Sequence, residues 1–567
     1  MKQSVQDRLD CITIGYNEVP FEKYVSLLSN FSEESPAYRD LKFSFINIEG
    51  EAVNYVTLLN QLARKSGARG LPGDGKNVFE SGDMPNLAAA YLTNYLRTKG
   101  FAAEYVNLFQ QEKQRLADYL EQDPLCVAIT TTFYVINLPV TEMVEFIRSI
   151  NPRVKIVVGG PLISNHVRNL KGDNLKMALQ DIGADYYVVD SQGEATLAQL
   201  TGCLKAGADI EQVANLIYFS HGELRETPII PERNSLEENY INWETFRDKD
   251  LGHTIQLRTA RSCAFSCSFC NYPTRAGKLT LADLGTVEKE LDSIRGLGSV
   301  ENVVFIDDTF NVPLPRFKEL CRLMIRKKYN FNWFSYFRCS NSDLEAFDLM
   351  AESGCKGVFL GIESGSPTIL KNMNKAATVE KYVDGISHLR ARKILTFGSF
   401  IVGFPGETDE TIEETIAFIR NTRPDYYRAQ NWYCEPGTPI ERQRDKYGIV
   451  GEGFEWKHNT MTNLEALDHI DRMFLTIHES LWLPQWSFDF WFIPYFMGMG
   501  ISLDDFHSFV ASAYKMLAMD IAYVPENEKR KLQAGHLQNM RLMVQRWFPL
   551  KQRRLPNSMA ATSVVSV

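Results

Sequence analysis

Apolar and polar residues alternate with two different spacings along the first part of the chain, and these spacings predict helices and strands in turn. The segment NLAAAYLTNYLRTKG repeats its apolar positions at helical spacing before Gly100 closes it. Short apolar runs of strand length follow, separated by amphipathic stretches, and read AAEYVNLF, CVAITTTF, VKIVVGGP and DYYVVDS. This alternation predicts an α/β unit with a five-stranded, doubly wound, Rossmann-like parallel sheet.

A second α/β unit is predicted from about residue 239 onward. A small hairpin pattern that starts with ANLIYFS and a proline-bearing linker precede it. Six further strand patterns alternate with helical stretches and read HTIQLRTA, VENVVFIDD, FNWFSYFRC, GVFLGIES, ILTFGSFIVGF and YRAQNWYCE. Six such units predict a partial (βα)6 barrel, and an active site in such a barrel lies at the carboxyl ends of the strands.

The patterns divide the chain into four expected regions. An N-terminal extension covers 1–75, the doubly wound domain 76–238, the partial barrel 239–455 and a mostly helical C-terminal domain 456–567. The very apolar stretch WLPQWSFDFWFIPYFMGMG lies in the last region. It contains Asp489 and two prolines and is barely long enough to span a membrane, so we expect a buried or pocket-lining segment.

Three of the ten cysteines lie together in the stretch RSCAFSCSFCNYPTR, directly after the first barrel strand. They are Cys263, Cys267 and Cys270, and the other seven are scattered singly, which fits a reducing compartment better than a disulfide framework. A structural zinc ion needs four ligands, and no fourth lies nearby in the sequence. Three thiolates leave one coordination position open, which indicates a metal cluster that also binds a substrate or cofactor.

This CxxxCxxC loop at the end of the first strand of a six-unit barrel resembles the radical S-adenosylmethionine (SAM) superfamily. The resemblance implies that the three thiolates hold a [4Fe–4S] cluster and that the amino and carboxyl groups of SAM bind the fourth iron. The segments IDDTF, GIESGSPTILKNMNK and GSFIVGFPGET match other parts of the family pattern. They imply a SAM-binding set made of Phe269, Asp308, Arg338, Glu363, Ser364 and Gly403.

The first unit resembles the cobalamin-binding domain that precedes some radical SAM barrels. Ligands of doubly wound sheets bind beyond the carboxyl ends of the strands, and the resemblance implies a corrin site there. Its turn VVGGP could equally be only a tight turn after a buried strand. The domain lacks a DxHxxG loop, so the resemblance implies no histidine beneath cobalt. The implied cobalamin-binding residues are Thr130, Thr131, Gly159, Gly160, Gly193 and Glu194.

The combined resemblance is to the cobalamin-dependent (class B) radical SAM methyltransferases. It implies that one SAM methylates cobalt while a second is cleaved to a 5′-deoxyadenosyl radical that abstracts hydrogen from the substrate. The segments DCITIGYNEVPFEKY, GFEWKHNTM and FDFWFIPYFMGMG are similar to a subgroup that includes the P-methyltransferase of phosphinothricin-type antibiotic pathways. We therefore expect methylation of an unactivated carbon or phosphorus centre in a small-molecule or peptide intermediate of antibiotic biosynthesis.

Two alternative functions remain compatible with the sequence. An enzyme with the same cofactors could catalyse cyclisation or rearrangement without methyl transfer, and a cobalamin-binding sensor could carry a catalytically silent barrel. Complete cluster and SAM motifs count against the sensor.

Composition narrows the partners and the compartment. The net charge of −9 argues against bulk nucleic-acid binding, and the N-terminus has no apolar run behind a basic start, so a cytoplasmic enzyme is expected. The basic stretch 529–554 is either a solvated helix face or a docking surface for an acidic electron donor such as flavodoxin or ferredoxin.

Overall fold

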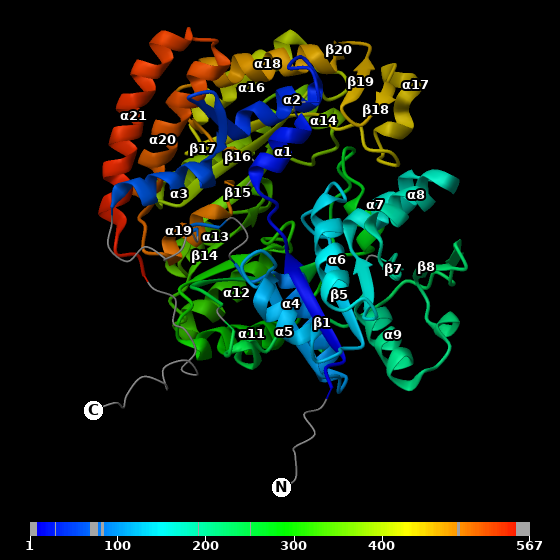
Figure 1. Cartoon of the computed structure of the whole chain (residues 1–567). Coiled ribbons are helices and arrows are strands. Elements are labelled where there is room, and N and C mark those ends of the chain that lie inside the picture. Colours follow the sequence, from blue (N-terminus) through cyan, green and yellow to red (C-terminus); the bar gives the residue numbers. More distant parts are fainter. Residues whose placement is uncertain are drawn as a thin grey trace. The chain divides into compact units, whose positions relative to one another are not determined.

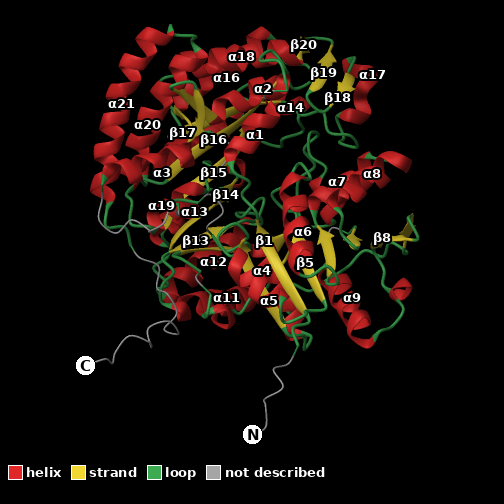
Figure 2. Cartoon of the chain, viewed as in Figure 1, coloured by secondary structure: helices red, strands yellow, loops and turns green. Residues whose placement is uncertain are grey.

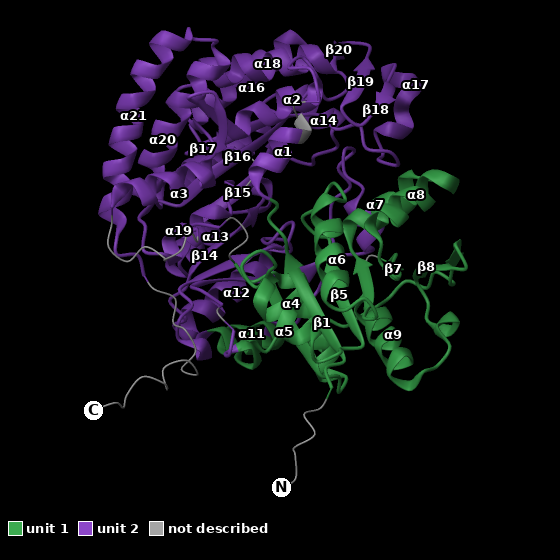
Figure 3. Ribbon diagram, in the orientation of Figure 1, with its two compact units in different colours: residues 1–19, 82–246, 285–294 green, residues 20–81, 247–284, 295–567 purple. Residues whose placement is uncertain are grey.

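A computed structural model describes residues 8–28, 30–67, 77–80, 84–190, 192–249, 251–484 and 488–551 (Figure 1). The chain divides into two compact units, shown in two colours in Figure 3. Unit 1 comprises 1–19, 82–246 and 285–294, and unit 2 comprises 20–81, 247–284 and 295–567. The segment expected as an N-terminal extension therefore contributes residues to both units. Each unit contains one seven-stranded sheet with helices between its strands (Figure 2).

The sheet of unit 1 contains five parallel strands and a hairpin. Its order is β4-β1-β5-β6-β7-β8-β9, in which the last two strands are antiparallel. The doubly wound expectation is confirmed. The strands are β1 (Cys11–Tyr16), β4 (Ala103–Leu108), β5 (Cys126–Thr130), β6 (Lys155–Gly159), β7 (Tyr186–Val188), β8 (Leu216–Ser220) and β9 (Glu223–Glu226).

The fifth parallel strand comes from the N-terminal segment and was not assigned from the sequence. Strand β1 lies between β4 and β5, where Ile12 pairs with Val127 and Ile14 with Ile129. With β1 included, the five parallel strands follow the order 2-1-3-4-5, in which the chain changes direction between the first and third strands. Ligands of such sheets bind beyond the strand ends at this switch point, here the ends of β1 and β5.

Successive residues of these strands pack into two cores, one on each face of the sheet. Ile156 and Val158 belong to one core, and Val157 between them belongs to the other. This follows from the two-residue period of a strand and explains why the strands read as continuous apolar runs. The first core includes apolar residues of α5 (Lys113–Leu120), α6 (Leu138–Ile150), α7 (Pro161–Asn169) and α8 (Gly172–Ile182), and the second those of α4 (Leu87–Thr98) and α9 (Glu194–Ala206).

The sheet of unit 2 is parallel throughout, in the order β10-β13-β14-β15-β16-β17-β21. All six predicted barrel strands are present, and β21 adds a seventh. The strands are β10 (Thr254–Leu257), β13 (Asn302–Phe305), β14 (Asn332–Phe337), β15 (Cys355–Glu363), β16 (Leu395–Val402), β17 (Tyr426–Asn431) and β21 (Leu481–Trp482). The helices of this unit between its strands include α12 (Leu314–Lys327), α13 (Leu344–Glu352), α14 (Pro367–Asn372), α15 (Val379–Ala391) and α16 (Asp409–Thr422). Helix α11 (Leu284–Leu297) follows β10 in the sequence, and its residues 285–294 are counted in unit 1.

The C-terminal region is mostly helical, as predicted, and it packs with helices from the N-terminal segment. The rings of Phe43 and Trp482 lie 4.8 Å apart, and those of Tyr55 and Phe488 lie 5.3 Å apart. Residues far apart in the sequence therefore share one core in unit 2. The helices are α1 (Phe21–Leu28), α2 (Pro36–Leu41), α3 (Tyr55–Ser66), α18 (Asn463–Thr476), α19 (Phe492–Gly498), α20 (Leu503–Ile521) and α21 (Glu526–Trp547).

The apolar C-terminal stretch serves as core packing. Phe490 is fully buried, and its ring lies within about 6 Å of three barrel-strand rings, those of Phe334, Phe359 and Phe397. No helix in the described part of the chain is both long and apolar enough to cross a membrane. The packing of Phe490 and its neighbours confirms the expectation of a buried segment for the described residues of this stretch, 482–484 and 488–500; residues 485–487 lie outside the described part of the chain.

The core of unit 1 offers a direct stability test on one helix, α8. Leu179 is fully buried and Met177 is 66% exposed. We expect Leu179→Ala to lower the free energy of unfolding by about 2–5 kcal/mol, because it leaves a cavity in a packed core. Met177→Ala should change it by less than about 0.5 kcal/mol. Urea denaturation followed by circular dichroism measures both, and equal effects of the two variants would contradict this packing.

Candidate active site

The three clustered cysteines lie in a loop between β11 (Ala260–Arg261) and α10 (Tyr272–Ala276). The loop begins at Ser262, whose φ of 71° is rare for a residue other than glycine. The Ser262 hydroxyl donates a hydrogen bond to the carbonyl oxygen of Gly277 at 2.6 Å, which holds this turn. Cys267 is buried, whereas Cys263 and Cys270 keep accessible surface.

The loop is anchored to the turn that follows α14. The Ser268 backbone N–H donates to the Met373 carbonyl oxygen, and its hydroxyl donates to that of Asn372, both at 2.8 Å. The Asn374 side-chain amide donates to the Ser266 carbonyl oxygen, also at 2.8 Å. Since these hydrogen bonds are made by residues between the cysteines, they fix the backbone from which the thiols project.

The three thiols are close enough to act on one another electrostatically. Burial raises the pKa of Cys270, and the charges of Cys267 and Cys263 raise it further. Among the described residues, no group of three or more His, Cys, Asp or Glu is placed to hold a single metal ion. In an iron–sulfur cluster each thiolate binds a different iron atom, so the sulfur atoms lie farther apart than they do around a single metal ion. Three thiols in one loop are the donor type that holds an iron–sulfur cluster.

Two adjacent carboxylates at the end of β13 have different surroundings. Asp307 is buried and accepts hydrogen bonds from the backbone N–H groups of Thr259 and Ala260, at 2.7 and 2.9 Å, just before the cysteine loop. Asp308 keeps accessible surface. Desolvation by the surrounding protein and the neighbouring charge of Asp307 raise the pKa of Asp308 to about 6. Asp307 therefore supports the loop, and Asp308 is the carboxylate available to a ligand.

Arg338 directly follows β14, and its side chain is buried. Its guanidinium lies 3.6 Å from the ring centroid of Phe265 in the cysteine loop, and its Nε donates to the Ser340 hydroxyl at 3.2 Å. Within the described residues its Nη2 is buried and has no hydrogen-bond partner. Because buried polar groups are rarely left unpaired, this atom suits an anionic ligand such as a carboxylate.

A buried ion pair connects the end of β15 with the turn that anchors the cysteine loop. Lys375 Nζ lies 2.9 Å from Glu363 Oε1, and both side chains are about one-tenth exposed. Burial by itself would lower the pKa of Lys375, but the Glu363 carboxylate more than offsets this and raises it. Lys375 Nζ also lies 5.5 Å from the ring centroid of Phe269. Glu363 adopts a φ of 70°, a strained conformation of the kind found at functional sites.

Ser364 and Gly403, two other residues of the expected SAM-binding set, make packing contacts. The buried Ser364 hydroxyl lies 3.2 Å from the Thr415 hydroxyl and accepts the Ser366 N–H at 3.1 Å. Gly403 has a φ of 86°, and a Cβ there would come within 2.3 Å of Trp456. In this structure both residues hold the strand ends in place.

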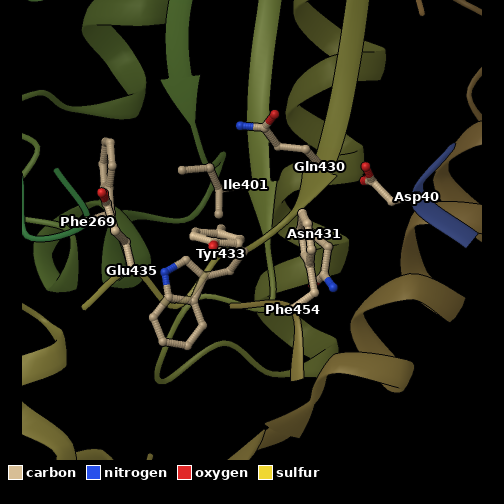
Figure 4. Close-up of a pocket in the computed structure, with 9 residues that line it drawn as sticks. Asp40, Phe269, Ile401, Gln430, Asn431, Tyr433, Glu435 and Phe454 are labelled. Atoms are coloured by element: carbon tan, nitrogen blue, oxygen red, sulfur yellow. The ribbon is translucent and has the colours of Figure 1, made fainter. Parts of the chain in front are cut away.

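A cavity of about 280 Å³ opens beside the strand ends of unit 2 (Figure 4). Phe269 and Ile401, which the sequence pattern indicated, line one part of it. Asp40, Gln430 and Asn431 line another part and were not predicted. The end of β17 was visible in the sequence, but nothing marked Asp40, which lies on α2. The remaining lining residues are Trp432, Tyr433, Glu435 and Phe454.

In unit 1, the residues expected at the strand ends form a tight hydrogen-bonded edge. The Thr131 hydroxyl donates to the Gly159 carbonyl oxygen at 2.9 Å, and the Thr130 hydroxyl donates to that of Gly15 at 3.0 Å. Gly160 has a φ of 112°, and an added Cβ would lie 2.8 Å from Thr131 Oγ1. These contacts require glycine at position 160 and bring the ends of β1, β5 and β6 together.

Gly193 and Glu194 lie at the start of α9, beyond the end of β7. Glu194 is buried, accepts the Gly193 N–H at 3.0 Å and accepts from the Asn234 amide at 2.8 Å. The Glu232 carboxylate accepts the N–H groups of Ala195 and Thr196, at 2.9 and 2.8 Å. This helix N-terminus is therefore satisfied by protein groups.

Sequence reasoning missed the apolar surface at the switch point of unit 1. Asn17, directly after β1, is buried, and its backbone N–H donates a hydrogen bond to the Tyr134 hydroxyl at 2.6 Å. On either side of Tyr134, the side chains of Phe133 and Val135 are 55% and 70% exposed. The sequence analysis did not recognise β1 as a strand, and the switch point could not be located without it.

Two family models match parts of this chain, one mostly within each unit. The Radical SAM superfamily model matches residues 257–419, and the B12 binding domain model matches 81–200. An uncharacterized methyltransferase of Pyrococcus horikoshii is 27% identical over 325 residues, covering 56% of this chain and 69% of the relative. The anaerobic magnesium-protoporphyrin IX monomethyl ester cyclase of Rubrivivax gelatinosus is 26% identical over 412 residues, covering 69% and 72%.

Two solved structures share the fold at low sequence identity. The radical SAM methyltransferase TsrM from Kitasatospora setae, solved with cobalamin and a [4Fe–4S] cluster, superposes with a TM-score of 0.54 at 19% identity, covering 80% of this chain and 97% of TsrM. The cobalamin-dependent radical enzyme OxsB gives a TM-score of 0.55 at 14% identity, covering 88% and 90%.

The cysteine loop lies within the residues that match the Radical SAM superfamily, so this part of unit 2 is a radical SAM domain. This domain and the B12-binding domain are the pair found in cobalamin-dependent radical SAM enzymes, as the sequence predicted, and the relatives include methyltransferases. The cofactors of these domains are a [4Fe–4S] cluster, SAM and cobalamin.

The Lys375–Glu363 ion pair predicts a distinctive pattern of stability. Lys375→Met should lower the free energy of unfolding by about 3–5 kcal/mol, because it leaves a buried carboxylate unpaired. Lys371→Met, at an exposed position of α14, should cost less than about 0.5 kcal/mol. The double variant Lys375→Met/Glu363→Gln should recover part of the loss. Chemical denaturation measures all three, and a double variant less stable than Lys375→Met would contradict this role for the pair.

Proposed function

We propose that the protein methylates an unactivated carbon or phosphorus centre of a small-molecule or peptide intermediate in antibiotic biosynthesis. One observation carries the proposal: Asp308 and Arg338 follow the ends of β13 and β14, and the cysteine loop comes shortly after β10 of the same parallel sheet. Asp308 is exposed, and Arg338 Nη2 has no partner among the described residues. Methyltransferase relatives support methyl transfer, among them the bacteriochlorophyllide d C-12(1)-methyltransferase of Chlorobaculum tepidum.

In this proposal the residues of unit 2 hold the cluster and SAM. Cys263, Cys267 and Cys270 ligate iron, and Arg338 Nη2 binds the SAM carboxylate. Asp308 accepts a hydrogen bond from the methionyl amine, which is favoured because Asp308 keeps accessible surface. The remaining SAM-binding set is Phe269 and Gly403, which shape the adenosine side, and Glu363 and Ser364, which hold the backbone at the end of β15.

The strand ends of unit 1 hold cobalamin in this proposal. Exposed Phe133 and Val135 offer an apolar surface at the switch point, suited to a large flat ligand. The tight edge at Gly160 lets such a ligand approach the backbone closely. The full proposed set of cobalamin-binding residues is Thr130, Thr131, Gly159, Gly160, Gly193 and Glu194.

When bound, the three cofactors supply one-electron cleavage of SAM and a methyl group for transfer. The chain contributes binding and orientation. The anchored loop fixes the thiols, Arg338 and Asp308 orient the methionyl end of SAM, and aromatic residues of the cavity wall exclude water from the reacting centre. An external reductant such as flavodoxin or ferredoxin, acting in the cytoplasm, completes the proposed system.

Cyclisation without methyl transfer is the second candidate function. It is favoured by the relationship to anaerobic cyclases of Rubrivivax gelatinosus and Cereibacter sphaeroides, which are 26% and 25% identical to this chain. A catalytically silent sensor has less support, because an unpaired Arg338 donor and an anchored three-cysteine loop have no evident use in a protein that only binds cobalamin.

The cluster assignment is tested by replacing the three loop cysteines with alanine. The triple variant should not reconstitute with about four irons per chain, whereas Cys321→Ala should. Cys321 is the matched control because it is fully buried on α12 and lies outside the loop. Iron analysis and the charge-transfer absorbance measure the result. Full iron content in the triple variant would overturn the assignment.

Product stoichiometry separates methyl transfer from cyclisation. Methylation by this route should yield S-adenosylhomocysteine and 5′-deoxyadenosine together, each about one per methylated product. Cyclisation would give 5′-deoxyadenosine without matching S-adenosylhomocysteine. SAM with a deuterated methyl group, with product analysis by mass spectrometry, provides the check. A product without the label would exclude the methyltransferase function and favour cyclisation.

A further inference from the structure

The cavity beside β17 has a polar end that the SAM-binding set does not use. Phe269, a member of the proposed SAM-binding set, lines one part of the cavity together with Ile401. In Figure 4, Asp40 lies on the other side of the cavity from Phe269, and its carboxylate points from the N-terminal segment towards Gln430. The polar end is defined here as Asp40, Gln430 and Asn431.

Ion pairs of Arg39 and Lys42, which lie one residue before and two residues after Asp40, hold this part of the chain in place. The Arg39 guanidinium bonds Asp468 and Asp471 of α18, both at 2.8 Å, and Lys42 Nζ bonds Asp471 at 2.8 Å. These ion pairs fix one side of the short helix α2 against α18. Because Asp40 is rotated by about 100° from Arg39 around the helix, its carboxylate is directed elsewhere, into the cavity.

The cation next to the polar end, Arg428, already forms a hydrogen bond with a protein side chain. Arg428 precedes Gln430 by two residues on β17, so both side chains point to the same face, and its Nη2 donates to Gln430 Oε1 at 2.8 Å. Burial lowers the pKa of Arg428 to about 10, and the charges of Asp40 and Asp489 act in the opposite direction. The cavity lining itself includes two carboxylates, Asp40 and Glu435, and no Lys, Arg or His among its described residues.

Asn431 indicates that this end is built for a ligand. Its side chain is only 3% exposed, yet within the described residues neither Nδ2 nor Oδ1 has a hydrogen-bond partner. A buried amide left unpaired on both atoms is costly, and a ligand in the cavity that Asn431 lines would supply the missing bonds.

We propose that Asp40, Gln430 and Asn431 bind the substrate through a protonated amino group. The carboxylate of Asp40 accepts from the ammonium, and the two amides accept from or donate to its neighbouring polar atoms. An anionic ligand group at this end would lie next to the Asp40 carboxylate, and the described lining of the cavity has no cation that could pair with the ligand. The assignment rests on the proposed function, because it takes the occupant of the cavity to be the substrate beside SAM.

Three probes with the same ring and different charge test the assignment: 2-phenylethylamine, 2-phenylethanol and 3-phenylpropionate. Isothermal titration calorimetry is done on the full chain with S-adenosylhomocysteine present, which fills the SAM site. The amine should bind at least about tenfold more tightly than the propionate, as expected for a charge-assisted hydrogen bond. Asp40→Asn should remove this preference, and Glu435→Gln, which changes the other lining carboxylate, should keep it.

Radiolabelled SAM binding measured by equilibrium dialysis distinguishes the substrate from SAM as the partner of Asp40. Asp40→Asn should leave SAM affinity within about twofold of the unchanged chain, since no charge-assisted bond to SAM is lost. The proposal is overturned if none of the probes binds, if the propionate binds as well as the amine, or if Asp40→Asn weakens SAM binding as much as amine binding.

These measurements need no turnover, so they separate this inference from the proposed function. Loss of amine selectivity in a protein that still transfers labelled methyl from SAM would overturn the amine site alone. Clear amine selectivity in a protein that transfers no methyl group would overturn the methyltransferase function alone.

Discussion

The buried ion pair between Lys375 and Glu363 is the interaction on which the geometry of unit 2 depends most. Lys375 belongs to the turn that anchors the cysteine loop, and Glu363 ends β15 in a strained left-handed conformation. A charge pair at this depth is stable only while both partners are present. It therefore couples the position of the loop to the end of a central strand, which a set of exposed contacts could not do.

The parallel order of the strands explains why the functional groups of unit 2 gather at one edge of the sheet. Parallel strands present their carboxyl ends together, so residues far apart in the sequence, such as Asp308 and Arg338, reach the same edge. Two of the buried polar groups that lack a partner among the described residues, Arg338 Nη2 and the Asn431 amide, lie at strand ends. The rigid sheet positions the segments that follow its strands, and these segments carry the polar side chains of the candidate site.

The sequence was sufficient to predict those features that depend on residues close together in the chain. Continuous apolar runs predicted the six barrel strands, and the spacing of Cys263, Cys267 and Cys270 predicted a cluster loop, because both depend on neighbouring residues. It failed where pairing is long-range. Strand β1 joins its sheet through contacts with residues about 90 and 115 positions later, and no local pattern reports such partners. The role of Lys375 was hidden for the same reason, since Glu363 and the cysteine loop come together only in the folded chain.

Asp40 shows how cofactor chemistry and substrate selection can be carried by different parts of one chain. The radical SAM match begins at residue 257, whereas α2 lies more than two hundred residues earlier and still lines a cavity of unit 2. The helix reaches that position through ion pairs with α18, which follows the matched region. Segments outside the matched barrel can thus change their lining residues without disturbing the strand ends that hold the cluster loop.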